Sequence, residues 1–470
     1  MVNITHLTIT DIINGYKSKK FSVSEIVGSY LERIKEVNPV LNAYITIDST
    51  NALKKAEELD SREILNPLHG IPFGIKDMFL TKGVRTTAAS RLLENYIPQY
   101  TATAVTRLEN AGAISLGKLN HDAWAHGSSG ENSDFGNTLN SWNKEYVPGG
   151  SSSGSGVSVA SDMAVFATGT DTGGSIRLPA SFTNTVGLKP TYGLVSRYGV
   201  IAMASSLDSI GHFSKTVRDS AKILNITQGS DGFDATLRQA QGKLFDYEKN
   251  LEKEIKGLKI GVPKEYVAEG LSSEVKKAFE DSLKVLKKLG AEIIDVSLPH
   301  TDAGIATYYI LQPSEVSSNL ARYDGVRFGH DRSNFGKEAK RRIMLGTYTL
   351  SSGYYDAYYK KAMQVRTLIK QDFDKAFEKV DALVSPVSPT LPWKFGEKAN
   401  DPLAMYLSDA LTVTINLAGV PALAIPAGFS TSNLPIGIQF IGPHFSEEKL
   451  FQIGHAYEQE TKFYERKPNL

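Results

Sequence analysis

The chain has 470 residues, of which 41% are hydrophobic and 22% are charged, as in ordinary globular proteins. Its 52 Lys and Arg residues nearly cancel its 51 Asp and Glu residues, which excludes a strong field that would draw the chain to nucleic acid or to an anionic membrane. Because the sequence has no cysteine, disulfides, cysteine nucleophiles and thiolate metal sites are excluded, and a reducing compartment fits.

The sequence shows no targeting or membrane segment. The first 20 residues have neither an apolar signal core nor an Arg-rich transit character. The longest apolar stretch, Leu411 to Phe429, contains Asn416, Pro421 and Pro426, so it predicts buried strands and turns rather than a membrane span. We therefore expect a cytoplasmic protein that does not bind a membrane.

The first strong pattern along the chain is an amphipathic helix from Ser22 to Lys35. Its apolar residues recur on one face, and Ser22 with Glu25 forms a capping-box pattern at its start. The pair Asn38-Pro39 predicts the end of this helix.

Helices alternate with short apolar strands farther along the chain. A second helix is expected from about Ser273 to Leu289, where Gly290 ends it and residues 291–298 follow as a strand. Short buried strands are expected at three further places, Ile71–Ile75, Ala113–Leu116 and Leu258–Val262. This alternation predicts an α/β fold with a mixed sheet.

Two glycine- and serine-rich stretches interrupt this pattern, at Pro148 to Gly156 and at Thr168 to Arg177. One interpretation is a pair of flexible linkers. The apolar run between them, Val157 to Ala167, predicts a buried helix instead, and linkers are seldom joined by a buried segment. We therefore disfavour linkers here, whereas the polar stretch from Gln228 to Lys256 predicts a surface excursion.

The sequence contains partial matches to motifs for phosphate binding, for a hydrolase nucleophile and for metal binding, but each match lacks a feature that the motif requires. Gly112 to Leu119 nearly spells a phosphate-binding loop, but Leu119 stands where a Mg²⁺-binding Ser or Thr is needed. The nucleophile-elbow pattern centred on Ser152 lacks the apolar strand that should precede it. His121 and His126 have no evident acidic partner, and we expect no metal site.

A lysine and a serine remain as candidates for amide chemistry. Lys76 is flanked by apolar residues, and burial would keep it neutral and able to act as a base toward serine. Ser175 follows two glycines, whose backbone freedom lets successive N–H groups point at one oxyanion. The alternatives stay open at this point: Lys76 could pair with Asp77 or Asp171, and Ser175 could lie in a tight turn with an idle hydroxyl.

Three long motifs favour the catalytic interpretation: HGIPFGIKD (69–77), PGGSSSGSG (148–156) and GTDTGGSIRLPASFTNTVGLKPTYG (169–193). In order and spacing, with 24 residues from Ser151 to Ser175, they resemble the amidase signature family. The resemblance implies the α/β amidase signature fold, a large central mixed β-sheet covered by helices on both faces. One departure is Ser153, where the family usually has glycine, and this serine must fit a crowded loop.

The resemblance also implies a Ser-cis-Ser-Lys triad. Ser175 matches the nucleophile, Ser151 the bridging serine reached through a cis peptide, and Lys76 the base. The positions around the nucleophile match two supporting sets: the backbone of Thr172, Gly173 and Gly174 as the oxyanion hole, and Asp171 with Arg177 as the polar pair that frames the loop.

Longer segments resemble one branch of the family, the A subunit of a tRNA-dependent amidotransferase, at residues 317–329, 337–362 and 401–412. Free glutamine carries a carboxylate and an ammonium, so its pocket needs one cation and one anion. Arg342 matches the carboxylate clamp, Asp409 the ammonium partner, and Tyr308 a tyrosine that lines the pocket. The alternative is that Arg342 and Asp409 are ordinary surface charges.

On this resemblance we expect one amidase domain over residues 1–470, with an N-terminal helical region (about 1–65), a signature core (about 66–225) and a C-terminal part (about 257–470) that completes the sheet and the pocket. Glutamine would be hydrolysed through a Ser175 acyl-enzyme, and the ammonia would convert Glu-tRNA(Gln), Asp-tRNA(Asn) or both.

The resemblance further implies a heterotrimer and no cofactor in this chain. A B subunit would bind ATP, Mg²⁺ and most of the misacylated tRNA, and a small C subunit would wrap both chains. The alternative enzyme is a stand-alone amidase of broad substrate range. The non-enzymatic alternative is a scaffold that has kept the fold without the chemistry.

Overall fold

One mixed sheet of 11 strands runs through the computed structural model, which describes residues 4–236, 245–267, 270–326, 329–399 and 401–470. In spatial order the strands are β1 (Tyr44–Ile47), β3 (Ile114–Leu119), β2 (Pro72–Lys76), β4 (Phe166–Asp171), β6 (Ser209–Ser214), β5 (Val186–Lys189), β10 (Ala422–Phe429), β11 (Pro435–Ile441), β9 (Ala382–Pro386), β7 (Lys259–Pro263) and β8 (Glu292–Val296). Strands from both ends of the chain therefore share one sheet.

The pairing of the strands places the loops that carry the glycine-rich motifs at one edge. Strand β2 pairs in parallel with β3 and β4, whereas β4 with β6 and β10 with β11 pair antiparallel, so the predicted mixed sheet is confirmed. Because parallel neighbours end at the same edge of a sheet, the segments that follow Lys76 and Asp171 meet there.

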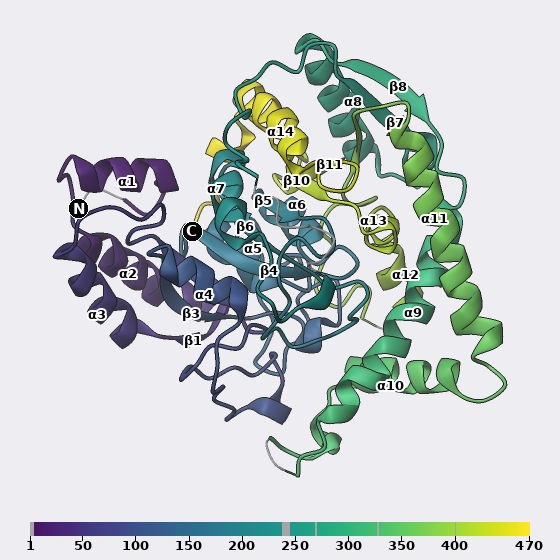
Figure 1. Ribbon diagram of the computed structural model, residues 1–470, viewed down its shortest axis with the longest axis horizontal. Coiled ribbons are helices and arrows are strands. Elements are labelled where there is room, and N and C mark those ends of the chain that lie inside the picture. Colours follow the sequence, from purple (N-terminus) through teal and green to yellow (C-terminus); the bar gives the residue numbers. More distant parts are fainter. Residues whose placement is uncertain (1–3, 237–244, 268–269, 327–328, 400) are drawn as a thin grey trace.

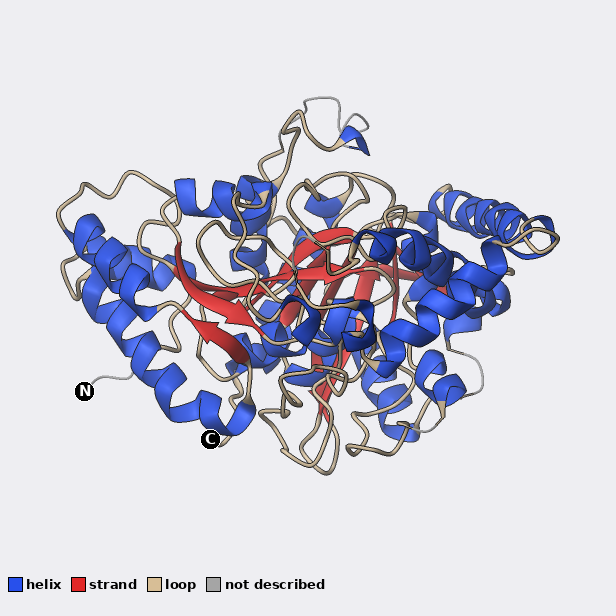
Figure 2. Ribbon diagram, turned by 90° about the horizontal axis from the view of Figure 1, so that it is seen from below, coloured by secondary structure: helices blue, strands red, loops and turns tan. Residues whose placement is uncertain are grey.

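Helices cover both faces of this sheet, as predicted (Figure 2). They are α1 (Ile9–Lys17), α2 (Val23–Leu41), α3 (Ser49–Asp60), α4 (Thr103–Asn110), α5 (Ser153–Ala160), α6 (Arg177–Thr183), α7 (Val217–Thr227), α8 (Ser273–Lys288), α9 (Gly304–Asn319), α10 (Lys337–Leu350), α11 (Lys361–Phe377), α12 (Pro402–Leu407), α13 (Val413–Ala418) and α14 (Glu447–Thr461). Helices α1 to α3 lie at one end of the molecule, and α9 to α11 lie at the other (Figure 1). Within the described ranges, no helix is long and apolar enough to cross a bilayer.

The helix predicted from Ser22 begins as expected but ends later. Ser22 Oγ accepts the N–H of Glu25, and the Glu25 carboxylate accepts the N–H of Ser22, so the capping box is confirmed. The predicted end at Asn38-Pro39 is wrong, because α2 continues to Leu41 with the proline inside it. Leu41 is fully buried, and its packing stabilises a last turn that proline disfavours.

The other predicted elements are found with shifted bounds. Helix α8 and strands β2, β3, β7 and β8 occupy the predicted places within three residues at either end, and Gly290 has φ 88° just after α8. The predicted helix at Val157 to Ala167 lies earlier, at Ser153–Ala160, and Phe166 already begins β4. The stretch from Leu411 holds a helix, α13, before the predicted strand β10.

The first glycine- and serine-rich stretch leads into the tightly packed helix α5 and is not a linker. Every residue of α5 is buried, and a Cβ at Gly154 would lie 2.5 Å from the carbonyl oxygens of Ala43 and Asn120. Small residues therefore let this helix approach its neighbours closely. Ser153 fits the crowded loop, where its hydroxyl donates to Thr138 Oγ1 at 3.2 Å.

Candidate active site

Lys76 is the last residue of β2, and its side chain is fully buried. Its Nζ atom lies 2.8 Å from Ser151 Oγ, 2.9 Å from Ser152 Oγ and 2.8 Å from Thr170 Oγ1. The lysine amine is thus surrounded by hydroxyl groups that come from the loop before α5 and from strand β4.

The salt-bridge alternative for Lys76 is wrong, because both Asp77 and Asp171 pair with other residues. Asp77 Oδ1 lies 3.1 Å from Lys118 Nζ, and Asp171 Oδ1 lies 3.0 Å from Arg177 Nη2. Burial lowers the pKa of Lys76 to about 7, and the charges of the nearby aspartates oppose this shift only in part.

The two serine loops are in direct contact. Ser151 is fully buried and follows a cis peptide bond from Gly150. The N–H of Ser152 donates to the carbonyl oxygen of Ser175 at 3.2 Å, which holds the end of one loop against the other. Within the described part of the chain no residue forms a hydrogen bond with the Ser175 hydroxyl, and the residue is 8% exposed, so this oxygen is available to a substrate.

Asp171 and Arg177 form the expected pair beneath residues 172–175, which carry the predicted nucleophile and which we call the nucleophile loop. The guanidinium donates to the carboxylate through Nε at 3.1 Å and Nη2 at 3.0 Å, and both side chains are fully buried. Burial by itself would raise the pKa of Asp171, but the charge and hydrogen bonds of Arg177, together with Lys189 and Asn416, outweigh burial and hold this pKa at about 2. The same carboxylate accepts the N–H of Gly174 at 2.9 Å and of Ile176 at 3.1 Å, so it shapes the turn directly.

The predicted oxyanion donors therefore need one correction. The N–H of Gly174 points to Asp171 and is not free, because the carboxylate lies under this turn. Among the described residues, the N–H groups of Thr172, Gly173 and Ser175 have no hydrogen-bond partner. A Cβ at Gly173 would lie 2.6 Å from Cζ of Tyr308, so the backbone is open only because this residue is glycine.

The predicted pocket residues lie together, and the surface-charge alternative is wrong. Arg342 and Asp409 are 4% and 6% exposed, and the Arg342 guanidinium lies 4.9 Å from the ring centre of Tyr309. The Tyr309 hydroxyl donates to Asp409 at 2.9 Å, and Ser128 donates to the same carboxylate at 2.8 Å. Tyr308, on the same helix α9, is buried against the nucleophile loop.

The environment of the pocket shifts the pKa values of Asp409 and Arg342 for different reasons. Burial raises the pKa of Asp409 to about 6, against the opposing hydrogen bonds from Ser128 and Tyr309. Burial would lower the pKa of Arg342, but Tyr309, Glu338, Tyr406 and Tyr308 together raise it above its usual value, so the guanidinium stays charged. Its Nη1 donates to Gln312 at 2.5 Å and its Nε to Glu338 at 2.7 Å. A cavity of 290 Å³ opens here, lined by Arg342, Glu338, Tyr406 and Ser129 among others.

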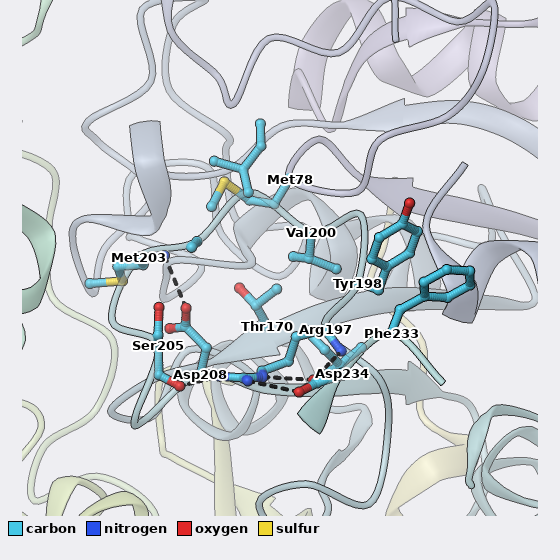
Figure 3. A pocket seen from close by; sticks show the side chains of 13 residues that line it. Met78, Thr170, Arg197, Tyr198, Val200, Met203, Ser205, Asp208, Phe233 and Asp234 are labelled. Carbon is cyan, nitrogen blue, oxygen red and sulfur yellow. Dashed lines mark hydrogen bonds and ion pairs between the residues drawn. The ribbon is translucent and has the colours of Figure 1, made fainter. Parts of the chain in front are cut away.

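A second cavity, of 230 Å³ (Figure 3), is lined in part by Thr170, whose hydroxyl also contacts Lys76. Its polar wall includes Asp208, which accepts the hydroxyl of Thr172 at 2.7 Å and whose pKa burial raises to about 6. The Arg197–Asp234 ion pair, 2.8 Å apart, also lines it (Figure 3). Apart from the undescribed positions, no group of three His, Asp or Glu side chains is arranged to hold a metal ion.

Several residues around the site were not predicted. Ser152 and Thr170 stand within the recognised motifs, but spacing alone does not show that their hydroxyls contact Lys76. No sequence pattern marks Tyr309 or Gln312, because their contacts with the site depend on the packing of α9 against α10. Asp122 accepts the N–H groups of Gly130 and Asn132 and donates its own N–H to Ser151, so it braces the bridging serine from a neighbouring loop.

Known proteins resemble this chain over its full length. It is 52% identical to the A subunit of the glutamyl-tRNA(Gln) amidotransferase of Geobacter metallireducens, over 99% of each chain, and 53% identical to that of Thermoanaerobacter pseudethanolicus, over 97% of each. The crystal structure of the corresponding amidotransferase chain from Thermotoga maritima superposes with a TM-score of 0.84 at 42% identity, over 98% of this chain and 96% of that one.

A peptide amidase of lower sequence identity has the same fold. The native peptide amidase from Stenotrophomonas maltophilia superposes with a TM-score of 0.85 at 30% identity, over 98% of each chain. The amidase family model matches residues 25–451, which include Lys76, both serine loops, Arg342 and Asp409. The shared sheet, the buried lysine between two serine loops and this match lead to one conclusion: the chain belongs to the amidase family.

Proposed function

We propose that this chain is the glutaminase subunit of a tRNA-dependent amidotransferase. The observation that carries the proposal is the buried pair of opposite charges, Arg342 and Asp409, beside the nucleophile loop, since a free amino acid presents both a carboxylate and an ammonium. A broad amidase acting on neutral amides would have no use for two buried charges. The full-length relatives with more than 50% identity carry the name of the amidotransferase subunit, whereas the peptide amidase is 30% identical.

In the proposed acylation step, Ser175 Oγ attacks the side-chain amide carbon of glutamine. The hydroxyl proton passes to Ser151, whose own proton passes to neutral Lys76. Collapse of the tetrahedral intermediate breaks the C–N bond, and the proton returns through Ser151 to the leaving nitrogen, which departs as ammonia. Water then attacks the glutamyl ester by the same route, which releases glutamate and restores the Ser175 hydroxyl.

The hydroxyl groups around Lys76 support its role as the base. A neutral amine has two N–H bonds and one lone pair. Ser152 Oγ donates to the carbonyl oxygen of Thr170 at 3.2 Å, so its oxygen is left to accept one N–H of Lys76. With Thr170 Oγ1 as acceptor of the second N–H, the lone pair faces Ser151 at 2.8 Å. Ser152 and Thr170 are thus positioning residues for the proton transfer.

The unpaired N–H groups of the nucleophile loop support the proposed oxyanion hole. The backbone of Thr172, Gly173 and Ser175 offers donors that need no reorganisation when charge develops on the amide oxygen. Gly174 contributes indirectly, because its bond to Asp171 fixes the turn. The Asp171–Arg177 pair, rigid and buried, holds this turn in place.

In this proposal the ammonia passes to a B subunit, which binds ATP and Mg²⁺ and activates the misacylated tRNA, and a C subunit completes a heterotrimer in the cytoplasm. The near balance of acidic and basic residues supports the placement of most phosphate contacts outside this chain. The chain itself would need no cofactor for the serine chemistry.

The decisive experiment is amidation of Glu-tRNA(Gln) by this chain together with its B and C subunits. Glutamine should support the reaction with the wild-type chain and not with Ser175→Ala, while ammonium chloride should support it with both. Glutamine-dependent amidation by Ser175→Ala would overturn the mechanism. Rapid hydrolysis of many neutral amides by the chain alone, with no response to the other subunits, would instead favour the stand-alone amidase.

A further inference from the structure

Helices α10 and α11 and the turn between them carry a surface of exposed apolar side chains. Met344 is 72% exposed, Leu345 42% and Tyr348 48%, and Tyr354 and Tyr358 in the turn are about as exposed as Leu345. Figure 1 shows that this turn projects at the edge of the molecule, away from the sheet. We call these five residues the tyrosine face. Exposed apolar groups of this density mark binding surfaces more often than free surface.

The tyrosine face is ordered by its own contacts. The ring centres of Tyr348 and Tyr354 are 4.3 Å apart, and Tyr358 lies 6.2 Å from Tyr348 and 6.0 Å from Tyr354. Met344 lies one helical turn before Tyr348 on the same side of α10. The turn leads into a π-helix at Asp356–Lys360, a rare conformation that is frequent at functional sites. Rigid tyrosines lose little entropy on binding, which is why protein interfaces favour them.

The ion pairs around the tyrosine face leave an excess of positive charge. Between residues 337 and 370 the exposed acidic side chain is Asp356, whereas the exposed basic side chains are Lys337, Lys340, Arg341, Lys360, Lys361 and Lys370, of which Arg341 is paired with Glu338 and Lys370 with Asp374. Lys361 forms no ion pair within the described residues, and Asp356 is neutralised by Lys360 at 3.2 Å. A complementary partner surface would be apolar at its centre and acidic at its rim.

We propose that the tyrosine face docks a partner protein subunit of the amidotransferase, with an apolar centre and an acidic rim. This inference rests on the proposed function, in which the chain is one subunit of a complex. Nucleic acid fits the face less well, because a phosphate backbone would have to lie against Met344 and Leu345, which offer it neither charge nor hydrogen bonds.

Docking on this face would also act on the glutamine pocket. The opposite side of α10 is buried against α9, where Gly346 packs directly on the carbonyl oxygen of Pro313 and leaves no room for a side chain. The same side carries Arg342, whose guanidinium contacts Gln312 on α9. A partner that clamps the outer side of α10 therefore restricts Arg342 relative to α9 and favours glutamine binding, and we expect it to lower the KM for glutamine several-fold.

The test uses the full chain with the B and C subunits from the same organism. Met344→Asp places a charge at the centre of the tyrosine face, and Lys361→Glu reverses the charge of one residue at its rim. Leu65→Asp is the matched control, because Leu65 is 77% exposed and lies after α3, outside the face. We expect Met344→Asp to weaken the complex at least about 30-fold and Lys361→Glu to weaken it less and in a salt-dependent manner. The control should bind like the wild type.

Glutaminase kinetics on the same proteins test the link to the pocket. All variants alone should have the wild-type kcat and the circular dichroism of the folded chain. Addition of the partners should lower the KM for glutamine in the wild type and in Leu65→Asp but not in Met344→Asp.

A wild-type affinity for Met344→Asp would overturn the proposal. So would a dimer of the chain alone that Met344→Asp dissociates, which would assign the face to a second copy. Binding of free tRNA that Lys361→Glu abolishes, with an intact subunit complex, would assign it to nucleic acid. If the wild type and Leu65→Asp both fail to bind the B and C subunits, the proposed function itself is overturned.

Discussion

Lys76 Nζ and Ser151 Oγ lie 2.8 Å apart in the protein interior, although 75 residues separate them along the chain. Among the described residues the amine has hydroxyl neighbours and no carboxylate in hydrogen-bonding contact, while Asp171, which could have held its charge, is paired with Arg177. Burial can therefore lower the pKa of the lysine without an ion pair that would restore it. This arrangement makes the pH dependence of the glutaminase reaction a direct test.

We predict that kcat/KM for glutamine falls as the pH drops below about 7. A lysine with a lowered pKa is neutral above that pKa. Below it, the fraction of lysine in the neutral, basic form falls tenfold per pH unit. Below about 6 the decline should steepen, because Asp409 becomes protonated and loses its attraction for the substrate ammonium. In Asp409→Asn the additional decline of kcat/KM below pH 6 should be absent, whereas the decline that begins near pH 7 should remain. A flat profile from pH 5 to 8 would contradict the assignment of Lys76 as the base.

Thr170→Val should lower kcat about 10- to 100-fold with little change in KM. The substitution keeps the shape of the side chain but removes the acceptor of one Lys76 N–H, so the lone pair is no longer directed at Ser151. Thr170→Ser keeps the hydroxyl and should restore most of the activity. Steady-state kinetics at pH 8, where the lysine is neutral, would measure both, and equal activity of the valine and serine variants would speak against a positioning role.

Asp409→Asn and Arg342→Lys should raise the KM for glutamine, by about 10- to 100-fold, with a smaller effect on kcat. Lysine keeps the charge of Arg342 but cannot reproduce its planar contacts with Tyr309 and Glu338. Glutaramate, which lacks the α-ammonium, separates the two roles. The Asp409 variant should process it as well as the wild type does, whereas the Arg342 variant should lose both substrates. An Asp409 variant that still prefers glutamine as strongly as the wild type would refute the ammonium assignment.

Arg177→Met should lower the free energy of unfolding by about 3–5 kcal/mol, because it leaves the fully buried carboxylate of Asp171 without its counter-charge. Denaturant unfolding followed by circular dichroism measures this change. The double variant with Asp171→Asn should recover part of the loss, since no buried charge is then left unpaired. A single variant as stable as the wild type would show that solvent reaches the pair.

Gly173→Ala should nearly abolish activity while the chain stays folded. A Cβ at this position would lie 2.6 Å from Tyr308, so either the pocket tyrosine or the oxyanion loop must move. Because a misplacement of about 1 Å can cost about 100-fold in rate, we expect at least that loss. The double variant with Tyr308→Phe tests which contact matters, since Cζ remains in place, and it should not restore the rate.

The sequence by itself predicted the fold class and the groups that lie together at the candidate site, but it placed the ends of some helices poorly. The glycine-rich motifs and their spacing identified the candidate triad, and the α/β fold with a mixed sheet is confirmed. The end of α2 was missed because local preference at Pro39 is weaker than the burial of Leu41. The helix at α5 was placed late because a run of serines and glycines has a low helix propensity in isolation, and tight packing overrides it.

What the sequence determined is the set of groups present: a lysine among apolar neighbours, two hydroxyl-rich loops and a cation and an anion far along the chain. Only the tertiary structure decided which of these groups meet, that the N–H of Gly174 donates to Asp171, and that the hydroxyls of Ser152 and Thr170 contact the lysine. The physical reason is that hydrogen bonds and burial depend on distances between strands that are far apart in sequence, and residue order carries no direct record of those distances.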